Sequence, residues 1–495
     1  MPLTLSEPAC RDAALSNSAA YTVLTLVTMA WMVARILNAE LVYEPSYHRH
    51  PDETSPPAPQ RVWPSTKPRS MPTFSSNDRS RWATVRALVD HGTFAIGEGT
   101  FDKELGRYRG GRGFEHGIIS EDGWGTVDKM MNPATGRFYS TKPPLLTAVA
   151  AAQYAVLKSL FGWSITENPE RVVKTILLLT NGVPLLWYLS LLRQIVSRFG
   201  RCEWSRCFTF AAGSWGTFVT TFSNTLNNHV PAAIITLGIL YFALLTDTTW
   251  TRSRISGVGF LAGLLICLEL PAAIFSFLIG VGIVRKVGYR ALIWGGVAAL
   301  IPVSAHFILN YLAVGDWLPA YSKLQSPWYQ YPGSHWLPPN PGEVKHGIDW
   351  ARFYESRLAY VFHMIAGHHG WFSLTPIWLL SLVALLAPRW TNWPWSRSTH
   401  VLFVAVSVIV IGFYLVATDN YGGWTCGPRW LIWLTPIWLV TLLPTVDRIA
   451  PYHFGRVFAG GLLAVSVVST CYPLVNPWRH PWLYRLMENA GWIHY

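Results

Sequence analysis

A polar, glycine-rich stretch from Asn77 to Leu146, between long apolar segments, carries an acid near its beginning and a lysine near its end. Asp78 stands where a helix is expected to begin, and Lys142 comes directly before Pro143-Pro144. A carboxylate can take a proton from a hydroxyl or amine nucleophile. A lysine at a helix start can hold a phosphate as a point charge. Helix capping by Asp78 and an interfacial position for Lys142 are the alternative interpretations.

The charges around these two groups sharpen the expectation. The dipole of the predicted helix, with Arg79 and Arg81 close in sequence, favours the ionised form of Asp78. Asp128-Lys129 lies in the same stretch, either as a second acid–base pair or as a surface salt bridge. Glu121-Asp122 is interpreted as solvated.

Other polar side chains are expected at the same face. Asn228 and His229 stand at the mouth between two apolar segments, where they either bind sugar hydroxyls or phosphate, or cap a helix. Arg429 follows a Gly/Pro turn and opens an apolar segment, which suits a bidentate phosphate contact, although the turn needs its glycines for structure alone. Glu269 lies in a short apolar helix, where a carboxylate is costly unless it is paired or faces water.

Several kinds of chemistry lack a supporting pattern. His363, His368 and His369 are spaced like metal ligands, but no carboxylate or cysteine pattern accompanies them, so a divalent metal is unsupported and no cofactor is predicted. The sequence holds no nucleotide-binding glycine motif, no zincin pair and no GxSxG. The six cysteines form no CxxC pair, and a Cys426–Cys471 bridge has no support.

The composition identifies the class of protein. Of 495 residues 51% are hydrophobic and 13% are charged, against about 25% charged in soluble domains. Apolar runs of about 20 residues recur along the chain, the length that crosses a bilayer core. The net charge of +12 fits positive cytoplasmic loops and contact with anionic membrane lipids, or a phosphate-bearing substrate. No nucleic acid partner is expected for a chain made mostly of spans.

The elements that must position these residues follow from the apolar pattern. We predict an all-α polytopic membrane protein with about 11–13 transmembrane helices and a large first extracytoplasmic loop carrying amphipathic surface helices. The predicted parts are a cytoplasmic N-terminus 1–18, a first transmembrane helix 19–38, a first extracytoplasmic loop 39–142 with a surface helix 77–91, a catalytic transmembrane module 143–312, an extracytoplasmic loop 313–370, C-terminal transmembrane helices 371–473 and an extracytoplasmic tail 474–495. Residues 97–137 show no regular element, and acceptor recognition is the hypothesis for them.

The basic loops predict the topology, with one conflict. Five arginine and lysine clusters fall in alternate loops and are expected in the cytoplasm. They are Arg193/Arg198/Arg201/Arg206, Arg252/Arg254, Arg285/Lys286/Arg290, Arg389/Arg397 and Arg448/Arg456. If segment 144–161 crosses the membrane fully, every later loop changes side. The sequence does not decide this point.

Three groups of residues carry a family resemblance. They are Asp78-Arg79-Ser80-Arg81-Trp82 with Ala87-Leu88 and His91-Gly92, then Tyr139-Ser140-Thr141-Lys142-Pro143-Pro144-Leu145, and later Gly422 to Trp430. They resemble integral-membrane glycosyltransferases of the GT-C superfamily, in particular the protein O-mannosyltransferase and lipid A aminoarabinose transferase type. The specific match covers residues 77–195.

The resemblance implies a polyprenyl-phosphate sugar donor, a lipid, glycan or protein acceptor, and inversion by direct displacement at the anomeric carbon. The protein would be a hexosyl- or pentosyltransferase in the inner (plasma) membrane, with an extracytoplasmic active site. Asp78 would be the base and Lys142 the donor-phosphate contact, with Arg79, Arg81 and Tyr139 nearby in the matching motifs.

The chain departs from the family pattern at two positions. Arg79 and Thr141 stand where many members have acids, so Asp128 is a candidate substitute for a second carboxylate.

Two other functions compete with this one. A transporter or flippase of a lipid-linked or anionic solute would have inverted repeats and ionisable residues near the bilayer midplane. The sequence shows no repeat, and its unusual polar residues fall at one face. A protein that binds lipid carriers without turnover is the third hypothesis.

Overall fold

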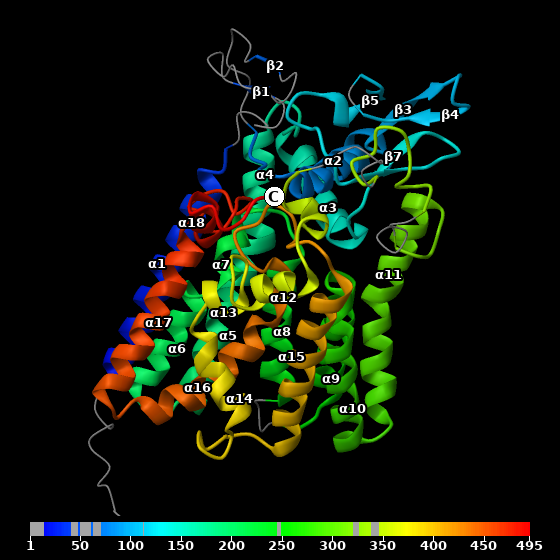
Figure 1. Ribbon diagram of the computed structural model, residues 1–495. Helices are drawn as coiled ribbons and strands as arrows, with labels where there is room; N and C mark the ends of the chain where they lie inside the picture. The colour runs from blue at the N-terminus through cyan, green and yellow to red at the C-terminus, as the bar shows by residue number, and fades with distance from the viewer. Residues whose placement is uncertain are drawn as a thin grey trace, which may run out of the picture.

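The computed structural model describes residues 14–40, 48–49, 61–62, 71–111, 113–244, 249–319, 326–337 and 346–495. Long helices run side by side in a bundle, and shorter elements cover one end of it, called the polar end below (Figure 1). In this part of the chain eight helical segments are long and apolar enough to cross a membrane, and His229–Ala243 is a shorter apolar helix. The predicted fold class, a mainly helical multi-pass membrane protein, is confirmed.

The bundle is built from helices of unequal length. They are α1 (Ala14–Leu37), α4 (Pro169–Leu177) continuing through the π-turn η2 (Leu178–Gly182) into α5 (Val183–Phe199), α6 (Glu203–Trp215), α8 (His229–Leu244), α9 (Arg252–Leu268), α10 (Ala273–Val287), η5 (Leu292–Gly296) continuing into α11 (Val297–Val314), α14 (Trp378–Leu386), α15 (Arg397–Ala417), η8 (Arg429–Leu434) continuing into α16 (Thr435–Ile449), and α17 (His453–Cys471). The Arg429–Ile449 span is 89% buried and forms the core, whereas Leu292–Val314 is 17% buried and leaves most of its apolar surface to lipid.

Glycine allows α9 and α11 to pack closely. A Cβ atom on Gly259 would lie 2.1 Å from the carbonyl oxygen of Gly295, and one on Gly263 would lie 2.3 Å from that of Ala299. Small residues of this kind let two membrane helices approach backbone to backbone.

We therefore expect Gly259→Ala to lower the melting temperature of the purified protein in detergent. The added methyl group must push two backbones apart, and overpacking of this kind costs about 1–3 kcal/mol. Gly257→Ala is the matched control, because a Cβ atom on Gly257 meets nothing within 4 Å. Equal melting temperatures of the two variants would contradict the close packing.

A small antiparallel sheet lies at the polar end. Its strands are β3 (Gly97–Asp102), β4 (Arg107–Arg109), β5 (Glu115–His116), β6 (Lys129–Met131) and β7 (Arg137–Ser140), in the order β4-β3-β7-β6 with β5 on β3. The prediction that residues 97–137 form no regular element was wrong. The strands are only two to six residues long, so they are too short to show the alternating apolar pattern that marks a half-buried strand. Farther upstream, β1 (His48–Arg49) pairs with β2 (Arg61–Val62).

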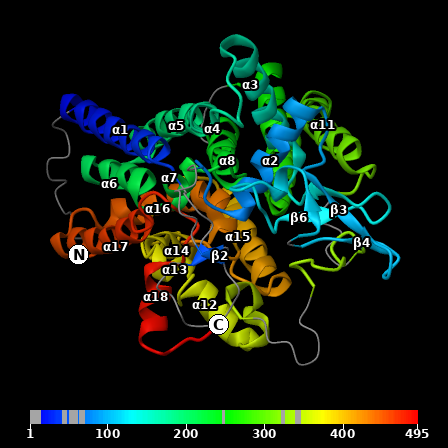
Figure 2. The same cartoon turned by 90° about the horizontal axis from the view of Figure 1, so that it is seen from above.

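The predicted surface helix is α2 (Ser76–His91), and its surroundings differ from the expectation. Ser75 caps it, because its hydroxyl accepts a hydrogen bond from the Asp78 backbone N–H, and Gly92 ends it in the left-handed conformation. Residues 77–87 are buried. Figure 2 shows why, since α2 lies beside α3 (Pro144–Phe161) and the strands rather than alone on the membrane surface.

Helix α3 has the length and apolar character of a span, but both of its ends are held at the polar end. Lys142, just before it, is bonded to Asp128 at 2.5 Å, and Lys158 near its end is bonded to Asp90 of α2 at 2.7 Å. Lys174 of α4 then donates to the backbone oxygen of Leu37 at the end of α1. We infer that α3 does not cross.

This position of α3 removes the conflict in the predicted topology. The chain crosses from the end of α1 to the start of α6 by α4 and α5 alone. The basic loops then meet at the far end of the bundle, where the Arg201 backbone N–H donates to Asp447 and Arg448 lies over Trp390.

The placement of α3 predicts which loops share a side of the membrane. In sealed vesicles of one orientation, Glu167→Cys and Lys103→Cys should react with an impermeant maleimide together. Ser398→Cys, at the far end, should react only after permeabilisation. The labelling of the parent protein, which has six cysteines of its own, is subtracted from each result. Labelling of position 167 together with position 398 would show that α3 crosses.

The remaining elements at the polar end come from the outer loop and the C-terminal tail. They are η7 (Ile348–Phe353), α12 (Arg357–Ile365), α13 (Trp371–Leu374) and α18 (Trp482–Asn489). Cys426 and Cys471 are free thiols, so they do not form a disulfide bridge with each other. Residues 1–13 and most of 44–70, interpreted as irregular segments, lie outside the described residues.

Candidate functional site

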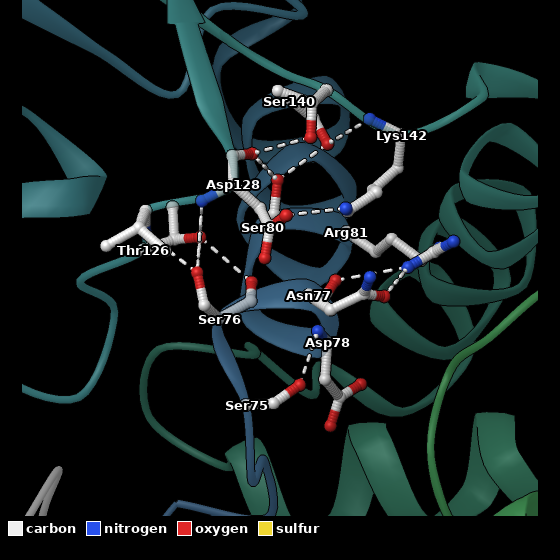
Figure 3. A network of polar contacts seen from close by, with 12 residues as sticks. Ser75, Ser76, Asn77, Asp78, Ser80, Arg81, Thr126, Asp128, Ser140 and Lys142 are labelled. Atoms are coloured by element: carbon white, nitrogen blue, oxygen red, sulfur yellow. Dashed lines mark hydrogen bonds and ion pairs between the residues drawn. The ribbon is translucent and has the colours of Figure 1, made fainter. Parts of the chain in front are cut away.

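An ion pair between Asp128 and Lys142 forms the centre of the site (Figure 3). Lys142 Nζ lies 2.5 Å from Asp128 Oδ1, and the two side chains are 16% and 12% exposed. The hydroxyl groups of Ser76, Ser80 and Ser140 fix the pair: the Asp128 backbone N–H donates to Ser76 Oγ, Ser80 Oγ donates to the Asp128 carbonyl, and Ser140 Oγ accepts from the Lys142 N–H. The pair therefore joins the start of α2, the start of β6 and the start of α3.

The charges of this pair are set by burial and by each other. Burial alone would raise the pKa of Asp128, but Lys142 and then Arg429 hold it below its ordinary value. Burial lowers the pKa of Lys142 to about 8, with Arg81 and Arg429 acting in the same direction and Asp128 against it. Both groups are thus charged at neutral pH.

Two arginines complete a group of three cations. Arg81 Nη2 donates to Asn228 Oδ1 at 2.6 Å, and the same guanidinium bonds Asn77. Burial lowers the pKa of Arg81 to about 10, while the Asp128 carboxylate opposes that shift. Arg429 Nε donates to the Gly422 carbonyl at 3.0 Å, so the Gly/Pro turn aims the side chain. Both arginines lower the pKa of Lys142 and Arg429 lowers that of Arg81, as expected of like charges that lie near one another.

A second carboxylate holds Arg429 in place through a histidine. Arg429 Nη1 donates to His229 Nε2 at 3.1 Å, and His229 Nδ1 contacts Glu269 Oε1. Asn228 Nδ2 also donates to Glu269 Oε1, at 2.6 Å. Since Nε2 accepts, Nδ1 carries the proton of a neutral imidazole. Glu269 is 5% exposed, and its hydrogen bonds to Asn228 and His229 offset the free-energy cost of burying a carboxylate at the end of an apolar helix.

A cleft opens beside Lys142, at the polar ends of α2, α3 and α11. Its polar lining is Thr84, Tyr139, Ser140, Lys142, Thr147 and Asn310. Its apolar lining is Phe94, Pro144, Ala313 and Val314. The lining of the cleft thus combines one cation and several polar groups with apolar side chains.

Asp78 lies in the wall of the site, and its carboxylate points away from Lys142 (Figure 3). Oδ1 accepts from Trp82 Nε1 at 3.0 Å and from the Leu226 N–H at 3.1 Å, and Oδ2 accepts from the Phe74 N–H at 3.4 Å. The side chain is 1% exposed. Burial raises the pKa of Asp78 to about 6, although these hydrogen bonds and Arg81 act against the shift. Arg81 favours the ionised form of Asp78, as expected, but desolvation outweighs it, so the net shift is opposite to the predicted one.

Other predicted residues fall into two groups. Asp128, Lys142, Arg81, Asn228, His229 and Arg429 come together, and Tyr139 lines the cleft. Arg79 instead donates to the Gly125 carbonyl at 2.7 Å.

The pair expected between Asp128 and Lys129 does not form, because Lys129 pairs with Glu115, at 2.6 Å. Glu121 is exposed to solvent, as interpreted, and also pairs with Arg86. Ser76, Ser80 and Ser140 were missed. Ser80 and Ser140 lie inside the two motifs and Ser76 lies two residues before the first, and this position is the only signal they offered.

The histidines with metal-like spacing form an aromatic cluster. The His363 and His368 rings stack 4.1 Å apart, and His368 Nε2 lies 2.9 Å from the Tyr495 hydroxyl. Across the described ranges, no group of three or more histidine, cysteine or acidic side chains is arranged to hold a metal ion.

Comparison with known proteins gives structural neighbours only. No family model and no curated protein matches the sequence. Two crystal structures of ArnT from Cupriavidus metallidurans match 94% of this chain, one bound to undecaprenyl phosphate (15% identity, TM-score 0.48) and one in the apo state (13% identity, TM-score 0.47). This chain spans 66% of the length of each. They are of the lipid A aminoarabinose transferase type, the type to which the motifs are similar.

Proposed function

We propose that this chain is a membrane glycosyltransferase that moves a sugar from a polyprenyl-phosphate-linked donor to an acceptor at the extracytoplasmic face. The observation that carries the proposal is the group of three cations, Arg81, Lys142 and Arg429, at the end of the bundle beside a partly apolar cleft. A lipid phosphate has its charge at the membrane surface and its tail in the bilayer. The site offers matching surroundings for both parts.

The cations would hold the phosphate and stabilise it as the leaving group. An ammonium has three donors, of which Asp128 takes one in the structure. The Arg429 guanidinium offers the fork geometry that suits phosphate oxygens. Charge that develops on the phosphate as the sugar leaves would be met by donors already in place, which is the most effective form of electrostatic catalysis.

The transfer would be one displacement with inversion. The acceptor oxygen or nitrogen bonds the anomeric carbon, and the bond from that carbon to the phosphate oxygen breaks with its electron pair going to the phosphate. The acceptor proton goes to a base, and Asp78 is the candidate. A carboxyl group whose pKa is about 6 is a stronger base than an ordinary aspartate and is still ionised at neutral pH.

This role places a requirement on Asp78. The carboxylate must leave the Leu226 and Phe74 N–H groups that hold it in the wall, and it must turn toward the acceptor. Asp128 is already paired with Lys142, so its proposed part is to orient that lysine rather than to take the proton.

Mass spectrometry after deletion of the protein tests the proposal. Cells that lack it should accumulate one polyprenyl-phospho-sugar and lose one sugar from a surface glycan, lipid or protein. Membranes from these cells should regain the product when purified protein is added. Unchanged lipid-linked sugars and glycans would overturn the proposal. Movement of a lipid-linked solute across proteoliposomes without a covalent product would identify a transporter instead.

A further inference from the structure

Three side chains outside the cation group come from the outer loop and the Gly/Pro turn. Asp349 and His335 form a pair, with His335 Nε2 3.8 Å from Asp349 Oδ2, and their side chains are 35% and 32% exposed. Trp424 is 57% exposed. None of them lines the cleft beside Lys142, and of the three only Trp424 belongs to a motif, Gly422 to Trp430.

Contacts place this trio next to the proposed phosphate site. A Cβ atom on Gly423 would lie 2.9 Å from Asp349 Oδ1, so the carboxylate rests on the residue between Gly422 and Trp424. Gly422 is the residue whose carbonyl holds Arg429. Asp349 is also among the carboxylates that interact electrostatically with Arg429.

The other side of the pair is tied to the Asp128 wall. The His335 ring contacts the ring of Trp336, with centroids 5.3 Å apart. Trp336 Nε1 donates to the carbonyl of Val127, the residue before Asp128, at 2.9 Å. The His335–Asp349 pair therefore spans from the Arg429 side of the site to the Asp128 side.

The chemistry of the trio suits a carbohydrate. A carboxylate accepts hydrogen bonds from two neighbouring hydroxyl groups, and an imidazole both donates and accepts. A tryptophan face offers a large, rigid surface for the apolar side of a sugar ring. The His480 ring packs against the indole of Trp424, with ring centroids 4.8 Å apart. More than half of Trp424 is still exposed to solvent.

We propose that Trp424, Asp349 and His335 form the acceptor subsite and that the acceptor group is a carbohydrate. This inference rests on the proposed function. Two simpler roles compete with it: a surface ion pair adds little to stability, and an exposed tryptophan can be an interfacial anchor. Neither of these roles predicts that the three side chains bind one ligand.

Binding of surface oligosaccharides tests the assignment. The probe is the oligosaccharide fraction released from cells that lack the protein, because its acceptor sugars are unmodified. The purified full-length protein should bind it, as measured by native mass spectrometry, and Trp424→Ala and Asp349→Asn should each weaken binding at least tenfold. Both variants should bind polyprenyl monophosphate as the wild type does. In membranes they should raise KM for the acceptor and leave kcat nearly unchanged.

Two variants are matched controls. Trp492→Ala removes a tryptophan that is 71% exposed, and Asp419→Asn removes a carboxylate paired with Arg352 of η7, the element that also carries Asp349. Both should bind the oligosaccharides normally. Equal binding by wild type and Trp424→Ala would overturn the subsite, and binding confined to a lipid or protein fraction would overturn the carbohydrate assignment. If the wild-type protein does not bind polyprenyl monophosphate, that result counts against the proposed function instead.

Discussion

Replacing Lys142 by glutamine is expected to reduce polyprenyl monophosphate binding and product formation on the order of 100-fold or more. The variant loses a cation beside the cleft and leaves Asp128 without its charged partner. Breaking a buried pair in this way costs about 3–5 kcal/mol, so the protein is also expected to melt at a lower temperature. Binding is measured by native mass spectrometry and product formation in membranes that lack the protein.

Two further variants separate binding from stability. Lys129→Gln breaks a pair of similar length and burial, Lys129–Glu115, in the same sheet, and it should lower stability while phosphate binding stays normal. The double variant Asp128→Asn/Lys142→Gln removes both charges, so it should recover stability without recovering binding. If binding follows the melting temperature through this series, Lys142 has a structural role only.

Asp78→Asn is expected to lose product formation on the order of 100-fold or more, the usual range for removal of a general base. The amide keeps an oxygen for the Trp82 and Leu226 donors, so the wall of the site should keep its shape. Asp90→Asn is the matched control on the same helix, because Asp90 bonds Tyr154 and Lys158 away from the site. A fully active Asp78→Asn protein would contradict the base role.

The same variant should change how stability depends on pH. Asp78 binds its proton more tightly in the folded protein, with a pKa of about 6, than in the unfolded chain, where the pKa is about 4. Its contribution to the free energy of unfolding is therefore complete below about pH 4 and is lost as the pH rises through about 6. The loss amounts to about 3 kcal/mol.

A comparison of melting temperatures reads out this effect. The difference between Asp78→Asn and the wild type should move in favour of the variant between pH 4.5 and pH 8, because the variant has no carboxylate to ionise. A difference that is constant with pH would contradict the raised pKa. Stability gained together with activity lost is the pattern expected of a residue kept for function.

Local signals predicted the elements that carry the site. The apolar segment 144–161 was predicted, and the structure has α3 from Pro144 to Phe161. A helix over 77–91 was also predicted, and the structure has α2 from Ser76 to His91. These features depend on backbone preferences that act within a few residues, so the sequence shows them directly.

The sheet, the path of α3 and the partner of Asp128 were not predictable in this way. Asp128 was paired in sequence with Lys129, but β6 turns alternate side chains to opposite faces, so Lys129 meets Glu115 and Asp128 meets Lys142. The apolar content of α3 is high enough for a span, and its position at one end follows only from long-range contacts, the pair between Lys142 and Asp128 and the pair between Lys158 and Asp90.

Composition and recurring apolar runs were therefore enough to predict a multi-pass helical membrane protein, and residue types in two motifs were enough to predict a candidate site at the two ends of one polar loop. Both depend on residue type and short-range spacing alone. Assembly of the site depended on tertiary structure. Arg429 and His229 are 200 residues apart in the chain and share a hydrogen bond, and burial reversed the expected shift of the Asp78 pKa. Desolvation and long-range contact are properties of the packed molecule, and no local pattern encodes them.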